Sequence, residues 1–268
     1  MPMIKVNHIE MYYEMHGRGF PLLLIMGLKR NTEWWYQQIP ELSRHFQVIA
    51  FDNRGAGRSD KPEMDYSISM FADDTAYLMD ALGIKQTHVL GISMGGYIAQ
   101  ELAITCSDLV QRLVLGCTSC GGRKAVLMSD ETRNAYVANE GLAHEQILRK
   151  DMHIYFSDEF IAREPKQIEQ FMQISMRHVQ PPDAFLHQFN ACLGHDTVDR
   201  LGDISAPTLI MAGDDDHLVP TQNALILKEL MPEAGLHLYP DKRHCFFMEE
   251  HERFNREVTE FFNSTTSP

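Results

Sequence analysis

Several features that commonly reveal a protein's class are scarce in this chain of 268 residues. Its five cysteines are an odd number at irregular spacing, which argues against a framework of disulfide bonds. No internal repeat or low-complexity tract is visible. The most apolar early stretch, residues 21–28, is far too short to cross a bilayer and fits a buried strand. The first eight residues lack the apolar core of a signal peptide, so we expect a cytoplasmic protein that does not bind membranes.

Positively charged residues are also fewer than negatively charged ones. Lys and Arg total 24 against 37 Asp and Glu, which gives a formal net charge of −13. Nucleic-acid partners require clustered cations, and the chain has no long basic run, so we expect no such partner. The 44% of hydrophobic and 23% of charged residues are those of an ordinary globular protein. The length suits one large α/β domain, or a core that carries an insertion.

Short apolar runs alternate with amphipathic segments of helix length, which predicts an α/β fold with a mostly parallel, twisted sheet flanked by helices. The chain opens with an expected antiparallel ribbon at residues 4–6 and 9–16. Buried strands are expected after it at residues 22–26, 47–51, 88–91, 113–115, 208–211 and 236–239. Helices are expected at residues 34–44, 68–82, 94–105, 221–231 and 249–262.

The alternation stops between residues 120 and 203, where no apolar strand run occurs. Pro165 and the pair Pro181-Pro182 separate successive helix patterns, expected at residues 133–138, 143–155, 166–178 and 183–192. This segment is too long for a simple crossover between parallel strands. We therefore predict a helical cap at residues 120–203, inserted into a core made of residues 1–119 and 204–268.

Gly91-Ile92-Ser93-Met94-Gly95 lies between an expected buried strand and an expected helix. A G-x-S-x-G sequence at such a junction is typical of a nucleophile elbow, in which a sharp turn holds the serine strained and exposed. At the start of the helix, the amide of Met94 can face a developing oxyanion. The alternative is that Ser93 merely caps the helix between two turn glycines.

A serine hydroxyl needs a histidine to remove its proton, and that histidine needs an acceptor that fixes its tautomer. Of the histidines beyond the cap, His237 falls within an expected strand and His251 within an expected helix. His244 instead falls in a loop just past the strand at 236–239, at the edge where Ser93 is expected. His244 is therefore the candidate base, in preference also to His217.

The acid is expected at the same edge of the sheet. The loop after the strand at 208–211 carries three consecutive aspartates, Asp214, Asp215 and Asp216, whereas the loop after the strand at 113–115 offers no carboxylate. The residues alone do not choose among the three. Two of them are expected to be turn or helix-cap residues.

Together these segments resemble the α/β-hydrolase superfamily, in particular its capped branch of serine esterases and lactonases. The resemblance covers nearly the whole chain, and its clearest segments are residues 13–17, 51–59 and 91–96. The acid motif of the family, G-x-x-D-x-x-x-P, matches Gly213, Asp216 and Pro220. Its closing motif, a histidine five residues before a glutamate, matches His244 and Glu249. The resemblance implies a catalytic triad of Ser93, Asp216 and His244.

Two positions depart from the family pattern. Met26-Gly27 replaces the usual His-Gly after the third strand, and the resemblance implies that the next residue, Leu28, supplies the second oxyanion-hole amide beside that of Met94. Arg243 stands where a glycine commonly precedes the catalytic histidine. The serine nucleophile also separates this chain from superfamily members that dehalogenate alkanes or open epoxides with an aspartate.

Two other motifs are expected to be structural. The Gly-Ala-Gly within residues 52–59 lacks the third glycine of a dinucleotide loop, and Arg54 beside it is expected to stabilise the fold. Cys117 and Cys120 form a lone C-x-x-C with no second pair, so we expect no zinc there. Cys245 has no role in the family pattern.

These observations predict a serine hydrolase that cleaves a small-to-medium carboxylic ester or lactone through an acyl-enzyme intermediate, with no metal or organic cofactor. Alternatives that share the triad are carbon–carbon bond hydrolases of ring-fission products and cofactor-free perhydrolases or haloperoxidases. A triad-bearing ligand receptor is the alternative outside enzymes. The Met and Phe side chains of the cap favour largely apolar substrates, although Arg123, Lys124 and Arg177 leave room for a single carboxylate contact.

Overall fold

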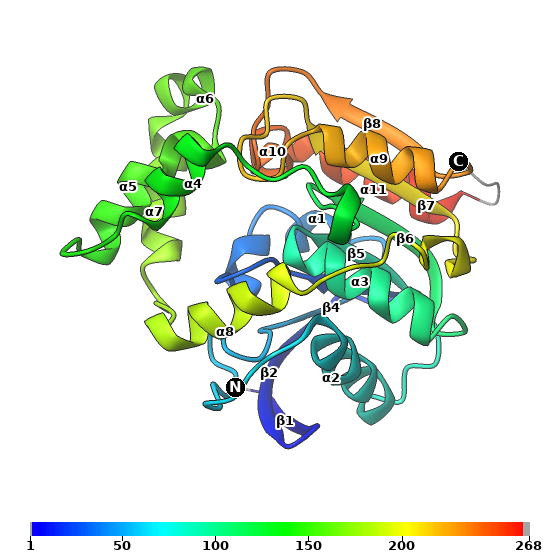
Figure 1. The fold of residues 1–268 in the computed structure, drawn as a ribbon. Coiled ribbons are helices and arrows are strands. Elements are labelled where there is room, and N and C mark those ends of the chain that lie inside the picture. The colour runs from blue at the N-terminus through cyan, green and yellow to red at the C-terminus, as the bar shows by residue number, and fades with distance from the viewer. Residues whose placement is uncertain (1, 265–268) are drawn as a thin grey trace.

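The computed structural model describes residues 2–264, which form one sheet and the helices around it (Figure 1). The sheet has eight strands in the order β1-β2-β4-β3-β5-β6-β7-β8. Every pair from β4 to β8 is parallel, and the two pairs that involve β2 are antiparallel. The predicted mostly parallel sheet is confirmed. Its strands are β1 (Met3–Val6), β2 (Ile9–His16), β3 (Pro21–Ile25), β4 (Gln47–Phe51), β5 (Thr87–Ile92), β6 (Val110–Gly116), β7 (Thr208–Gly213) and β8 (Gly235–Tyr239).

The apolar strands explain why the sheet is covered on both faces. Neighbouring side chains of a strand point to opposite faces, so Leu22 and Leu24 of β3 pack in one core cluster while Leu23 and Ile25 pack in the other. One face is covered by α2 (Ile68–Ala81), α3 (Met94–Thr105) and α9 (Gln222–Leu230). The other is covered by α1 (Ile39–Leu42), α10 (Phe246–Glu249) and α11 (His251–Asn263).

Two predicted helices differ from those in the structure. The helix expected at residues 34–44 is wrong: a 3₁₀ turn, η1 (Thr32–Trp35), is followed by the short α1. Pro40 lies in the first turn of α1, where its missing N–H costs nothing, but inside a longer helix that N–H would be needed. The helix expected at 249–262 is present as α11, which begins two residues later than expected because the chain turns at Glu250, where ψ is 40°, between α10 and α11.

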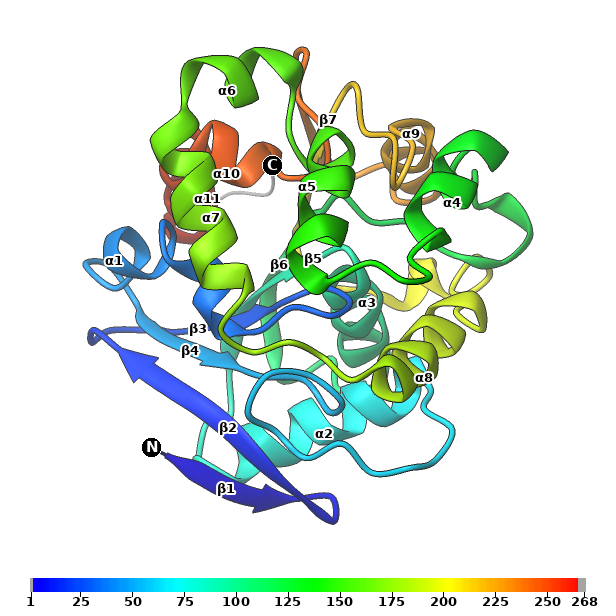
Figure 2. The ribbon, with the colours of Figure 1, turned by 90° about the vertical axis from the view of Figure 1, so that its left-hand side faces the viewer.

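Five α-helices occupy the chain between β6 and β7, where the cap is predicted: α4 (Asp130–Val137), α5 (His144–Tyr155), α6 (Asp158–Arg163), α7 (Pro165–Ser175) and α8 (Pro182–Leu193). In Figure 1 α4 to α7 stand to one side of the sheet, and in Figure 2 α5 and α7 lie in front of β3, β5 and β6. Tyr155 of α5 contacts Arg30, beyond β3, and Cys245, beyond β8. The helices therefore cover the carboxyl edge of the sheet.

The helix α6 was not expected from the sequence. Ser157 caps it by accepting a hydrogen bond from the amide of Phe160, and Asp158 and Glu159 lie in its first turn. Pro165 does more than end a helix, because it is the first residue of α7. Within residues 2–264 no helix is both long and apolar enough to cross a membrane.

Candidate active site

Ser93 lies in a tight turn between the end of β5 and the start of α3. Its backbone angles, φ 58° and ψ −121°, are unusual for a residue other than glycine and give the strained geometry of a nucleophile elbow. The turn leaves no room at the flanking glycines. A Cβ atom on Gly91 would lie 2.3 Å from the carbonyl oxygen of Gly95, and one on Gly95 would lie 2.0 Å from that of Ile25. The glycines of the motif are therefore required by close packing.

Asp216 and His244 form a buried hydrogen-bonded pair. The Nδ1 atom of His244 lies 2.8 Å from Oδ2 of Asp216, and the two residues are 6% and 5% exposed. The Oδ1 atom of Asp216 accepts hydrogen bonds from the amides of Leu218 and Val219, at 2.8 and 2.9 Å. These amides fix the carboxylate, and the carboxylate in turn fixes the imidazole, which leaves Nε2 of His244 free for a base.

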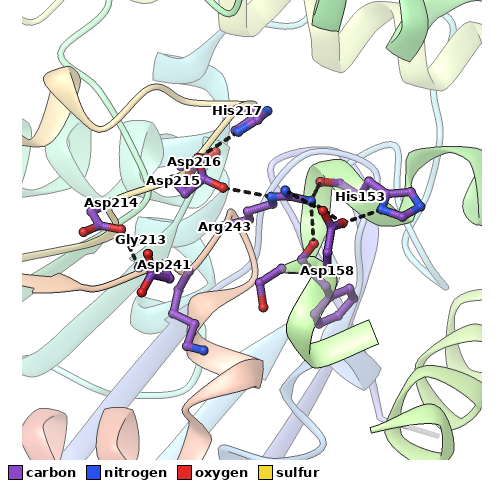
Figure 3. Close-up of polar contacts among 12 residues, drawn as sticks. His153, Asp158, Gly213, Asp214, Asp215, Asp216, His217, Asp241 and Arg243 are labelled. Atoms are coloured by element: carbon purple, nitrogen blue, oxygen red, sulfur yellow. Dashed lines mark hydrogen bonds and ion pairs between the residues drawn. The ribbon is translucent and has the colours of Figure 1, made fainter. Parts of the chain in front are cut away.

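The neighbouring aspartates make different contacts, as Figure 3 shows. Asp214 accepts a hydrogen bond from the amide of Asp241 and so closes a turn. Asp215 pairs with His217 and Arg243, at 2.9 and 3.1 Å. Only Asp216 of the three aspartates contacts His244, in agreement with the choice that the family motif implies.

The other histidines beyond the cap are less suited to be the base. His217 and His237 are exposed and pair with Asp215 and Glu257, away from the buried pair. His251 begins the helix α11. The burial and the partner of His244 therefore set it apart from these three.

The predicted oxyanion amides are available beside Ser93. The amide of Leu28 makes no hydrogen bond within residues 2–264, and Met94 opens α3, where an amide has no acceptor in its own helix. Gly27 brings the Leu28 loop against the nucleophile, since a Cβ atom there would lie 3.0 Å from Cβ of Ser93. Asn53 holds the same loop by donating a hydrogen bond to the carbonyl of Met26.

The Ser93 hydroxyl itself makes no hydrogen bond to the residues that the structure describes. In an enzyme without substrate, catalytic hydrogen bonds are often long and shorten only when substrate binds. Ser93 thus lies at the same edge of the sheet as Asp216 and His244. The hydrogen bond between Ser93 and His244 that would complete the triad is not formed in this structure.

Cys117 is a neighbour of this site that the sequence did not reveal. Its thiol and the ligand atoms of Asp216 and His244 all lie within 4.8 Å of one another. Burial raises the pKa of this thiol well above its usual range, which disfavours the thiolate that binds metals. Because Nδ1 of His244 is engaged by Asp216, the group fits an acid–base pair better than a metal site. The position of Cys117 directly after β6 was the available signal.

Arg243 and Glu249 tie the cap to the loop of His244. The guanidinium of Arg243 donates to the carbonyls of His153 and Phe156 and pairs with Asp158, as well as with Asp215 of the core (Figure 3). Glu249 accepts hydrogen bonds from the amide and hydroxyl of Ser157. The two residues that the family motif brought to attention thus hold α5 and α6 in place.

Arg54, which was expected to stabilise the fold, and the basic residues singled out in the predicted cap all form ion pairs within the protein. Arg54 forms a buried ion pair with Asp74, at 2.7 Å. The three cationic side chains singled out in the predicted cap all pair with carboxylates, and Arg123 and Arg177 are exposed while Lys124 is half-buried. Arg123 pairs with Asp199, Lys124 with Glu229 and Arg177 with Glu33. The single carboxylate contact suggested for them is therefore not supported by their positions.

The fold and the elbow at Ser93 define an α/β hydrolase. A sequence model of the alpha/beta hydrolase fold family matches residues 21–251, and the chain belongs to this family. The predicted membership of the superfamily is confirmed, and with it the assignment of the chain as a hydrolase.

Relatives of known name differ in their substrates. The chain is 30% identical, over 88% of each chain, to a protein of Azorhizobium caulinodans named "Putative carbamate hydrolase RutD". It is similar to a meta-cleavage product hydrolase from Pseudomonas fluorescens, with a TM-score of 0.84 and 28% identity over 99% of this chain and 98% of the other. It is also similar to a thermophilic esterase from Thermogutta terrifontis, with a TM-score of 0.80 and 26% identity over 95% and 93% of the two chains.

Proposed function

We propose that this protein is a serine hydrolase that cleaves a small-to-medium carboxylic ester or lactone through an acyl-enzyme intermediate. The observation that carries the proposal is the buried Asp216–His244 pair, which lies at the same sheet edge as the strained turn at Ser93. An oriented imidazole with a free Nε2, beside a serine raised on an elbow, is the arrangement that acyl transfer requires.

In this mechanism Ser93 attacks the carbonyl carbon while Nε2 of His244 takes the hydroxyl proton. The amides of Leu28 and Met94 donate hydrogen bonds to the oxygen that becomes negative. His244 then gives its proton to the leaving alcohol, and the acyl group stays on Ser93. Water deprotonated by His244 attacks this ester, and the serine leaves as the free hydroxyl once His244 returns the proton. Asp216 stabilises the imidazolium throughout.

The similarity to the RutD relative supports one further candidate bond, that of a carbamate. A carbamate offers the same carbonyl carbon to Ser93 and a leaving group that His244 can protonate. The similarity to the meta-cleavage product hydrolase supports carbon–carbon bond cleavage as a second alternative. Identification of the products by mass spectrometry separates these reactions, because the triad serves all of them.

The experiment is a screen of the purified protein with aryl esters, lactones and carbamates, beside Ser93→Ala. We expect turnover of esters or lactones that falls to background in the variant. Ser69→Ala is the matched control, since this serine is exposed on α2, away from the candidate site. Failure of the wild-type protein to turn over any ester or lactone would contradict the proposal.

A further inference from the structure

Arg30 is a buried cation in the loop that carries the proposed oxyanion donor. It is 6% exposed, and its amide donates to the carbonyl of Gly27. Only Lys29 separates Arg30 from Leu28 along the backbone, which limits their Cα atoms to about 7.6 Å apart. Arg30 lies outside the predicted cap, and no sequence motif pointed to it.

Aromatic side chains hold the guanidinium from two sides. Its Cζ atom lies 3.9 Å from the ring centre of Trp34 and 5.1 Å from that of Tyr155, and Nη2 donates to the Tyr155 hydroxyl at 2.8 Å. The amide of Cys245, the residue after His244, donates to the carbonyl of the same Tyr155. Arg30 is therefore fixed between the loop of the oxyanion donors and the loop of the catalytic histidine.

The guanidinium has no carboxylate partner. Among residues 2–264 no carboxylate oxygen lies within 4.0 Å of it, and Nε and Nη1 donate no hydrogen bond. Among the described residues, neither nitrogen belongs to the polar atoms that are both fully shielded and unpaired, so each keeps some surface that solvent can reach. A buried guanidinium without an anion is costly, and Arg has a planar fork of donors suited to a carboxylate.

Other basic groups gather around the same place. Burial and the charge of Arg30 lower the pKa of Lys29 to about 8. Burial and the charges of Lys29 and Arg30 also lower the pKa of His144, at the start of α5. The nearby carboxyl of Asp151 has its pKa raised by burial, and its Oδ1 lies 3.1 Å from Lys150. The local charge balance favours an added anion.

We infer that Arg30 binds a carboxylate group of the substrate, so that the preferred ester, lactone or carbamate carries a free carboxylate apart from the scissile bond. This inference rests on the proposed function for the scissile bond but not for the binding of the anion. It reverses the preference for uncharged apolar substrates predicted from the cap. Arg30 lies in the same loop as Leu28, the proposed oxyanion donor beside Ser93, and the inference requires one substrate molecule to span Arg30 and Ser93.

The first test measures binding without turnover. Ser93→Ala protein is titrated with monomethyl glutarate and, separately, with dimethyl glutarate, at constant pH and ionic strength. Trp34 touches Arg30 and is one of only two tryptophans, so its fluorescence reports the site. We expect a saturable change with the monoester, absent in Trp34→Phe, and at least tenfold weaker binding of the dimethyl ester.

Variants of Arg30 separate recognition from folding. Arg30→Met in the same background should weaken binding of the monoester at least tenfold, whereas Arg30→Lys should recover part of it. Arg123→Met is the matched control, because this exposed arginine pairs with Asp199 and should leave binding unchanged. Thermal unfolding of each variant identifies any that has not folded, and Arg30→Lys then carries the test.

The second test measures turnover with Ser93 intact. We expect kcat/KM for the monoester to exceed that for the dimethyl ester at least tenfold, mainly through KM, and Arg30→Met to remove this ratio while it still cleaves the dimethyl ester. Equal binding and turnover of the two esters, unchanged in Arg30→Met, would overturn the inference and leave the hydrolase proposal intact. Binding of the monoester without turnover of either ester, or of any ester or lactone in the screen above, would instead contradict the hydrolase proposal alone.

Discussion

Asp214, Asp215 and Asp216 differ in what their carboxylate oxygens contact. Asp214 accepts from a turn amide and Asp215 pairs with His217 and Arg243, whereas both oxygens of Asp216 are engaged by two amides and His244. At the scale of single residues, the role of a carboxylate here depends on the loop geometry that follows β7. That geometry also decides which of the three substitutions should impair catalysis.

Asp216→Asn should lower kcat by roughly 10³ to 10⁴-fold, because an amide in place of the carboxylate favours the wrong tautomer of His244. Asp214→Asn and Asp215→Asn should cost less than about tenfold. Steady-state kinetics on one activated ester, with thermal unfolding as a check on folding, measures all three. A larger loss in Asp215→Asn than in Asp216→Asn would contradict the assignment of the acid.

Ser93 should react with a fluorophosphonate probe, since the elbow exposes its hydroxyl and His244 can take the proton. Mass spectrometry of the digested protein should place one adduct on the peptide that contains Ser93. His244→Gln should slow the labelling by at least a hundredfold, and His217→Gln, which changes an exposed histidine, should not. An adduct on another serine in an active preparation would refute the nucleophile.

At the scale of elements, the sequence predicted the strands better than the helices of the cap. Apolar runs such as residues 22–26 are long enough to mark buried strands, and the strands β3 to β7 lie where they were expected. The helix α6 has only six residues, too few for a periodic pattern to stand out. The interruption near Pro40 could be anticipated from the missing amide.

Arg243 joins elements that are distant along the chain, since it contacts α5, α6 and the loop after β7. Arg243→Met should loosen the attachment of the cap and lower stability by about 1–2 kcal/mol, because two carbonyls lose a charged donor. We expect faster amide exchange in α5 and α6 than in the wild-type protein. Arg133→Met, which removes an exposed pair within α4, is the control and should change neither. Unchanged exchange in Arg243→Met would argue against this attachment.

At the scale of the whole molecule, the fold and the main candidate residues could be predicted because they leave local signals. The elbow is a short motif at a strand–helix junction, and Asp216 and His244 follow strands that end at one edge. Arg30 leaves no such signal, and Cys117 leaves only its place directly after β6, because their importance depends on neighbours from distant elements, such as Tyr155 for Arg30 and His244 for Cys117. Only the folded chain brings these groups together.

Two buried histidines make the stability of the whole molecule depend on pH. His88 stacks on Phe262, and His195 stacks on Tyr97, with ring centres 4.8 and 4.3 Å apart. Burial lowers the pKa of each imidazole to about 4. Nδ1 of His88 and Nε2 of His195 have no hydrogen-bond partner among residues 2–264, so a proton added to either ring would create an unsatisfied donor.

The free energy of unfolding should therefore fall as the pH is lowered from about 6.5 towards 4. In this range the histidines of the unfolded chain, with a pKa near 6.5, bind protons, whereas those of the folded protein stay neutral. Each histidine can contribute a slope of up to about 1.4 kcal/mol per pH unit. Burial raises the pKa of Glu249, which offsets part of this loss.

Urea unfolding at pH 7 and pH 5 measures the fall in unfolding free energy. His195→Phe, which keeps the contact with Tyr97, should reduce this fall. His45→Gln changes an exposed ring and should leave the fall unaltered. An undiminished fall in His195→Phe would show that this histidine does not control the acid sensitivity.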